Sequence, residues 1–288
     1  MMATRVMVPK GRTLLGWALV APPVLLMLVF LIVPAVRVIA TTFHTKGSPG
    51  LWTLANYQSF LTDGYALANL SVTLRTTFVT MALLLLVNFP IALYLRFRTG
   101  RLAVFIQALA LFPMFVPGVI ICYALMRYLG PNGLLQSVLE LMGMHFYRTP
   151  IGGFWGPVIG LVWDGMPFTL LVLTAGLSAI SNASIEAARD VGAGKWQILR
   201  AIILPQVKTT LTVITSLNFL SLFGSVLQPF MLGPASPEMM GPFMLRTFSS
   251  VRDPLMAGTQ ATITFLICSL AGLAYILTIR NRPDGGKT

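Results

Sequence analysis

Long stretches without charged residues recur along this chain, and each is about as long as a helix that crosses a lipid bilayer. Such a helix needs about 20 predominantly apolar residues. Charged residues make up 10% of the 288 residues, whereas a soluble domain carries about 25%. This excludes a soluble enzyme, a disordered chain and a secreted disulfide scaffold, and it predicts an all-α integral membrane protein with a single domain over residues 1–288. The six predicted transmembrane helices are Thr13–Val36, Thr76–Leu95, Leu102–Met126, Trp155–Leu177, Thr209–Leu232 and Pro254–Ile279.

The first stretch follows Arg5, Lys10 and Arg12, an order that secretory signal peptides share. The apolar region of a signal peptide is only about 7–15 residues long, and the stretch here is longer. No small-x-small cleavage site follows it. We therefore expect an uncleaved first transmembrane helix.

The net charge of +12 is explained by topology. If the chain starts in the cytoplasm and crosses six times, 13 of its basic residues fall on the cytoplasmic side and 7 outside. Cytoplasmic segments of membrane proteins carry such an excess of lysine and arginine. The charge thus predicts a multi-pass inner-membrane protein, surrounded by lipid, with both termini in the cytoplasm. It leaves no need for a nucleic-acid partner.

The cytoplasmic connection before the fifth predicted helix is the most patterned segment of the chain. It reads as two short helices around a hinge, in which Ser184 can cap the first helix and Gly192 and Gly194 end it. Pro205 is expected to end the second helix. The apolar stripe of that helix comprises Trp196, Leu199, Ile202 and Ile203. The pattern alone fits a loop that packs back on its own bundle and equally a surface that docks a soluble partner.

The same segment carries a family signature: Glu-Ala-Ala, three residues, Gly, nine residues, and then Ile-x-Leu-Pro. On this signature the chain resembles permease subunits of binding-protein-dependent ABC importers. The resemblance implies the type I importer transmembrane fold, with a five-helix core over residues 65–280 and cytoplasmic coupling helices within residues 184–205. It also implies three kinds of partner: a second homologous permease, two ATP-binding subunits and an external solute-binding protein. The matching positions are Glu186, Ala187, Ala188, Gly192, Ile202, Leu204 and Pro205.

The resemblance also implies roles for residues of this loop. Glu186 would face the ATPase subunit, and the small side chains of Ala187 and Ala188 would allow close approach. Gly192 would make the turn, and the second half of the loop would brace the first against the bundle. The full predicted coupling loop comprises Glu186, Ala187, Ala188, Arg189, Asp190, Gly192, Ala193, Ile202, Leu204 and Pro205.

No catalytic motif is evident. A phosphate-binding loop needs G-x-x-x-x-G-K-[ST] before a helix, and the tail Gly286–Thr288 has Asn281 where the first glycine belongs. His44 and His145 stand alone in external loops, so no metal site is expected. We therefore expect a transport subunit without a bound cofactor, with ATP and Mg²⁺ on a separate subunit. A membrane-embedded enzyme and a stand-alone secondary transporter are the less favoured alternatives.

Two sets of polar residues within predicted helices are candidates for the solute path. Asp164, next to Trp163, is the only acidic residue inside a predicted span, and ionisable residues in membranes mark functional sites. It would attract a cationic solute, or it would be a carboxylate near the outer mouth that is paired with a basic residue or hydrated. The second set forms a stripe with spacings of three, four and three residues, which suits either a hydrophilic wall or hydrogen bonds between helices. That stripe is Asn218, Ser221, Ser225 and Gln228.

Two branches of the importer family compete. The segment Leu227–Gly233 and the pair Met239–Met240 resemble spermidine/putrescine-type permeases. The segment Val162–Phe168 resembles sugar-importer permeases, but the Gly-Gly-Pro feature of that branch is absent. The resemblance thus favours a polyamine or a related small polar solute, with a sugar as the alternative.

Overall fold

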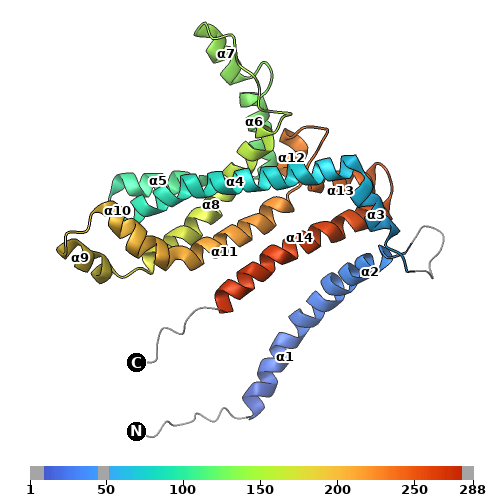
Figure 1. Ribbon diagram of the computed structural model, residues 1–288, viewed down its shortest axis with the longest axis horizontal. Helices are drawn as coiled ribbons and strands as arrows, with labels where there is room; N and C mark the ends of the chain where they lie inside the picture. Colours follow the sequence, from blue (N-terminus) through green and yellow to red (C-terminus); the bar gives the residue numbers. More distant parts are fainter. Residues whose placement is uncertain (1–9, 45–51, 281–288) are drawn as a thin grey trace.

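The computed structural model describes residues 10–44 and 52–280, and every regular element in these ranges is helical (Figure 1). The all-α prediction is confirmed. The predicted cytoplasmic tails and the motif at Gly286–Thr288 lie outside the described residues. The helices are α1 (Lys10–Met27), α2 (Val33–Thr41), α3 (Ala55–Thr62), α4 (Gly64–Phe97), α5 (Arg101–Leu111), α6 (Gly118–Leu129), α7 (Leu134–Leu141), α8 (Trp155–Ser178), α9 (Asn182–Asp190), α10 (Lys195–Ile198), α11 (Leu204–Phe223), α12 (Leu227–Leu232), α13 (Met240–Ser249) and α14 (Pro254–Arg280).

Five helical stretches are long and apolar enough to cross a bilayer. They are α1 with α2, then α4, α8, α10 with α11, and α14. A bent pair, α5 with α6 and α7, makes a sixth if it is counted as one span. The prediction of six transmembrane helices thus agrees with the count of six that includes the bent pair.

Helices α4, α8 and α11 pack on one another at the centre of the bundle, and α14 packs on α11. Leu84 of α4, Leu173 of α8 and Ile214 of α11 are almost fully buried there. Helices in membranes approach closely where side chains are small. At Gly176 of α8 an added Cβ would stand 2.4 Å from the Oγ1 atom of Thr210. This contact therefore requires glycine.

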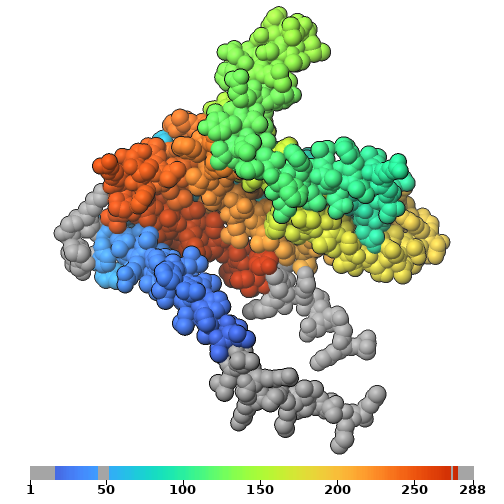
Figure 2. All heavy atoms as spheres, turned by 180° about the vertical axis from the view of Figure 1, so that it is seen from behind, coloured from blue at the N-terminus to red at the C-terminus, as the bar shows by residue number. Residues whose placement is uncertain are grey.

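The first span stands apart from this centre. A π-helical segment, Leu28–Ile32, joins α1 to α2, and α2 packs on α14. In Figures 1 and 2, α1 diverges from the rest of the bundle toward its start. The apolar side chains of the first span are exposed, and Trp17 of α1 and Phe30 of the π-helical segment are each 74% accessible. This surface must be covered by lipid or by another apolar protein surface.

The third predicted span bends far more than a kinked helix. Pro113, Pro117 and Gly118 predict a kink in this span, and the chain turns by 106° at the break between Phe115 and Gly118. Proline lacks the N–H that continues a helix, and its ring disfavours helical geometry at the preceding residue. The second half, with α7, projects from the bundle as an arm (Figures 1 and 2). The predicted span from Leu102 to Met126 is therefore divided between two helices, α5 and α6, and is not one kinked helix.

The fifth predicted span differs at both ends. Helices α10 and α11 form one continuous stretch, Lys195–Phe223, through a π-helical segment at Leu199–Ile203. Pro205 therefore does not end a helix. It lies in the first turn of α11, directly after the π-helical segment, and a missing N–H is tolerated at that position. The predicted end at Leu232 is also wrong. The helix stops at Gly224, and α12 follows as a separate short helix.

Candidate functional site

The segment between α8 and α11 begins as a helix, a turn and a second helix, as the sequence predicts. Gly192 follows α9 with φ of +83°, a value that glycine adopts without a Cβ clash. Gly194 precedes α10, and its N–H donates to a side-chain oxygen in the first turn of that helix at 2.8 Å. The predicted cap is wrong, because Ser184 lies inside α9. Ser181 holds the capping position, and its side chain makes no capping hydrogen bond.

One face of this loop packs on the bundle and the other is exposed. Ile185 of α9 is buried in the same apolar cluster as Ile198 and Ile203. Packing on the bundle therefore holds for the inner face, and docking of a soluble partner stays a prediction for the outer face. Among the predicted coupling residues, Glu186, Ala187, Arg189, Asp190, Gly192 and Pro205 are exposed, whereas Ala188, Ala193, Ile202 and Leu204 are half-buried.

The predicted apolar stripe of the second helix is wrong at one position. Trp196 is 69% exposed, because it lies in the first turn of α10 beyond the bundle, and Ile198 takes the buried place. Val191, in the turn, is 84% exposed. Exposed apolar side chains beside charged residues are typical of protein interaction surfaces. The outer face of the loop has this character.

Sequence reasoning missed the residue that ties the loop to the bundle. Arg96, in the last turn of α4, donates from Nε to the carbonyl of Leu177 at 3.0 Å and from Nη2 to that of Ile180 at 2.9 Å. It also bonds the side chain of Asn182. A cation at a helix C-terminus satisfies carbonyls that have no partner within the helix. Because Asn182 is held there, α9 starts at this residue rather than at Ser184.

The candidate path residues converge on a cavity of about 550 Å³ between α8 and α11. Asp164, Asn218, Ser221 and Ser225 all line it. Gln228 belongs to α12, so the predicted stripe is not one continuous helix face. Its side chain nevertheless reaches the same place, where it accepts a hydrogen bond from Ser225 Oγ at 3.1 Å and donates one to Asp164.

Asn218 also has a packing role. Its Nδ2 atom donates to Thr169 Oγ1 of α8 at 3.0 Å, and both side chains are buried. This is a hydrogen bond between helices, as one of the two alternatives for the stripe proposes. Trp163 lies on α8 outside the cavity lining, and its buried Nε1 has no hydrogen-bond partner among the described residues. Ser221 is exposed toward the cavity.

A second polar network lies at the end of the bundle opposite the α9–α10 loop, where it links segments that are distant in the sequence. Arg246 of α13 bonds Glu238 with N–O distances of 2.6 Å and reaches the hydroxyl of Tyr65 at 3.0 Å. The Glu238 bond raises the pKa of Arg246 above its usual value. Asn69 and Thr73 of α4 accept backbone N–H groups from the same segment. The network fixes the connection between α12 and α13 on the start of α4.

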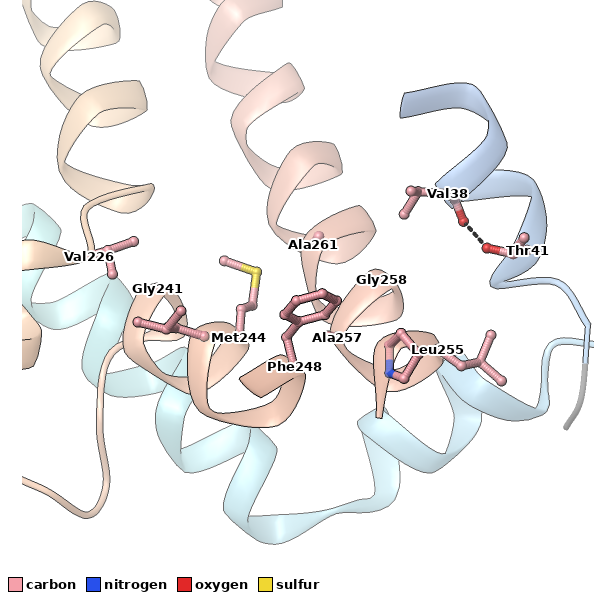
Figure 3. A pocket seen from close by; sticks show the side chains of 12 residues that line it. Val38, Thr41, Val226, Gly241, Met244, Phe248, Leu255, Ala257, Gly258 and Ala261 are labelled. Carbon is pink, nitrogen blue, oxygen red and sulfur yellow. Dashed lines mark hydrogen bonds between the residues drawn. The ribbon is translucent and has the colours of Figure 1, made fainter. Parts of the chain in front are cut away.

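An apolar cavity lies near this end. It has a volume of about 690 Å³ and lies between α2, α13 and α14 (Figure 3). Val38, Met244 and Phe248 point into it, and none of its lining residues is charged. It offers nothing to orient a polar solute.

Residues 85–281, about two thirds of the chain, match the family of binding-protein-dependent transport system inner membrane components. The chain belongs to this family. It is therefore a multi-pass inner-membrane permease of a binding-protein-dependent ABC importer, as its signature loop predicts.

Two relatives show the range of solutes within the family. The chain is 27% identical to the spermidine/putrescine transport system permease protein PotB of Escherichia coli, covering 91% of this chain and 94% of that protein. It is also 27% identical to the trehalose/maltose transport system permease protein MalF of Thermococcus litoralis, over 94% and 95% of the two chains.

Solved structures of importer permeases share the fold. A chain of a bacterial ABC transporter that imports alginate superposes with a TM-score of 0.75 at 19% identity, covering 95% of this permease and 98% of that chain. A chain of the MetNI methionine transporter in an inward-facing conformation gives 0.58 at 19% identity, covering 74% and 93%. The type I importer transmembrane fold is thus confirmed.

Proposed function

We propose that this permease forms half of the translocation path for a small cationic organic solute, such as a polyamine, which an external binding protein delivers. A second homologous permease would supply the other half. The cavity between α8 and α11 carries this proposal. It places one carboxylate, Asp164, beside the hydroxyls of Ser221 and Ser225 within the membrane-spanning bundle.

The charge of the cavity favours a cation. None of its lining residues is basic, and no described cation pairs with Asp164. A carboxylate at this depth is costly unless it finds a partner, and the amino group of a solute would supply one. The name of the PotB relative agrees with this solute class. The MalF relative keeps a sugar as the second candidate, because Asn218, Ser221 and Ser225 suit solute hydroxyls.

The outer face of the loop would dock on an ATP-binding subunit, and two such subunits would hold ATP and Mg²⁺. Glu186 and Asp190 are exposed on α9 for this contact, next to Val191 and Trp196. The small side chains of Ala187 and Ala188 would admit the partner closely, and Gly192 would set the turn. Ile202, Leu204 and Pro205, with Ala193, would brace the loop on the bundle.

The loop and both chain ends would face the cytoplasm. The start of α1 and the end of α14 point toward the same end of the bundle as α9 (Figure 1). Arg96, Arg98 and Arg101 lie at that end with the four basic residues of the loop segment. Such a concentration of basic residues marks the cytoplasmic side.

Uptake of labelled spermidine by cells that express the complete transporter tests the proposal. Asp164→Asn removes one charged contact, worth about 1.5–3 kcal/mol, so the KM for spermidine should rise about tenfold or more. Glu140→Gln is the matched control, because this carboxylate lies on α7 outside the cavity. Unchanged spermidine uptake by Asp164→Asn would exclude the cationic solute, and loss of trehalose uptake instead would favour the sugar.

A further inference from the structure

A further cavity lies where the last turn of α4 meets the loop helices. Its volume is about 470 Å³. Leu93, Ile198 and Ile203 give it an apolar interior, and Arg98 and Arg189 belong to its lining. Lys195 is the third basic residue, and no acidic residue lines the cavity. An apolar interior under a wholly cationic rim suits a ligand with an anionic head and an apolar body.

The three cations form no ion pair with a described carboxylate, although Glu186 lines a neighbouring cavity together with Arg189. Arg98, Arg189 and Lys195 are all exposed, and none forms a described ion pair or side-chain hydrogen bond. Glu186 and Asp190 lie on the same helix as Arg189 but do not line the cavity or pair with its cations. Three like charges around one opening repel one another, so an anion bound between them would relieve that repulsion.

An apolar track leads from this cavity along α4. Residues three and four apart share one face of a helix, so Phe97 and Leu93 align with Pro90 and Leu86. Phe97 and Leu86 are 42% and 70% exposed. From Phe97 to Leu86 the helix rises about 16 Å, close to half of the about 30 Å hydrocarbon core. The track therefore has the length of one lipid leaflet.

We propose that this cavity binds one anionic phospholipid. The phosphate lies between Arg98, Arg189 and Lys195, and one acyl chain follows the α4 track. Basic pockets between transmembrane helices at a membrane surface bind anionic headgroups in this way. An acidic surface of a partner protein would pair with the cations but would leave the apolar interior and the track uncovered, so the lipid fits better.

The lipid would bind where the loop rests on the bundle, since Arg189 lies on α9 and Lys195 starts α10. It would therefore hold the loop to α4 in addition to the Arg96 contact. This inference rests on the proposed function only for the choice of leaflet. A loop on the cytoplasmic side contacts lipids of the inner leaflet.

The test uses the purified full-length chain in phosphatidylcholine nanodiscs with and without phosphatidylglycerol. Native mass spectrometry after transfer to detergent counts the phosphatidylglycerol that stays bound. Each of Arg98→Gln, Arg189→Gln and Lys195→Gln should weaken retention about fivefold, since a lysine or arginine near an anionic surface contributes about that factor. Arg189→Lys should retain the lipid. Soluble glycerol phosphate should not displace it, because it lacks the acyl chain.

Matched controls are Arg101→Gln and Arg200→Gln, two exposed cations at the same end of the bundle but outside the cavity. Equal losses in controls and cavity variants would mean diffuse attraction and would overturn the proposal. So would full retention by the triple cavity variant, or displacement by glycerol phosphate. Dissociation of co-expressed ATP-binding subunits with lipid retention intact would assign the cations to a protein contact instead. The assay needs no transport, so its failure is separate from failure of the proposed function.

Discussion

Replacing Arg96 should release the loop from the bundle without preventing membrane insertion. The guanidinium makes three hydrogen bonds, to the carbonyls of Leu177 and Ile180 and to the side chain of Asn182. A hydrogen bond to a charged group contributes about 1.5–3 kcal/mol. Water can replace part of each bond, because Arg96 is half-buried. We therefore expect Arg96→Ala to weaken the docking of α9 by about 3 kcal/mol in total.

A loss of about 3 kcal/mol changes the ratio of docked to released α9 by about 150-fold. Burial of Ile185 would remain, so the released state should be populated but not complete. Hydrogen exchange of the α9 amides measures this ratio directly. In the complete transporter, the amount of solute moved per ATP hydrolysed should fall, because the loop would move without the bundle.

Asn182→Ala should cost only one of the three bonds, about 1–2 kcal/mol. The double variant with Arg96→Ala should add little, since both changes remove the same contact. Arg101→Gln, an exposed cation five residues further on, is the control and should behave as the unchanged chain. Full protection of α9 and unchanged coupling in Arg96→Ala would refute the reasoning.

Three smaller predictions concern other contacts. Gly192→Ala places a Cβ at positive φ and should cost about 1–2 kcal/mol, which reduces co-purification of the ATP-binding subunits. Gly176→Ala should lower the Tm by overpacking worth about 1–3 kcal/mol, and Thr210→Ala should restore part of it, because the Cβ atom of residue 210 stays 2.8 Å from the added methyl group. Arg246→Gln leaves Glu238 nearly buried without its cation and should destabilise the fold by about 1–3 kcal/mol. Because the pKa of Arg246 is raised, its contribution is complete below the usual arginine pKa and is lost only as the pH rises through the higher value, so the loss of Tm should be equal across the neutral range.

Each of these predictions has a control or an excluding result. Gly272→Ala is the control for both glycine variants, because an added methyl group at Gly272 meets no atom within 4 Å. Normal association of the ATP-binding subunits with Gly192→Ala would contradict the turn assignment. If Thr210→Ala restores none of the Tm lost in Gly176→Ala, the strain lies elsewhere. A loss of Tm with Arg246→Gln that changes over the neutral range would point to a different titrating group.

Hydropathy predicts helices well here but does not predict where they break. The run Thr209–Leu232 has no charge, so it reads as one span, yet the helix ends at Gly224. The same holds at Pro117, where apolar composition continues across a turn of 106°. A window average treats glycine and proline as members of an apolar run, whereas the backbone responds to each one singly.

The two short helices of the loop were predictable because their glycines and apolar spacing are local properties. Arg96 was not, because its partners Leu177 and Ile180 are more than eighty residues away and are backbone carbonyls. An arginine at the cytoplasmic end of a transmembrane helix satisfies the positive-inside rule whether or not it bonds distant carbonyls. The sequence therefore does not distinguish the two cases. The approach of Gln228 to Asp164 was missed for a similar reason, since it depends on the fold bringing α12 back against α8.

The continuous stretch from Lys195 to Phe223 makes the loop and the cavity wall parts of one rod. Its 29 residues span about 43 Å. If the π-helical segment Leu199–Ile203 and Pro205 keep their shape, a tilt of about 5° at the Lys195 end displaces the Phe223 end by about 4 Å. Ser221 lies in the last turn of that rod. A displacement of one water diameter or more at this position would open or close the polar cavity.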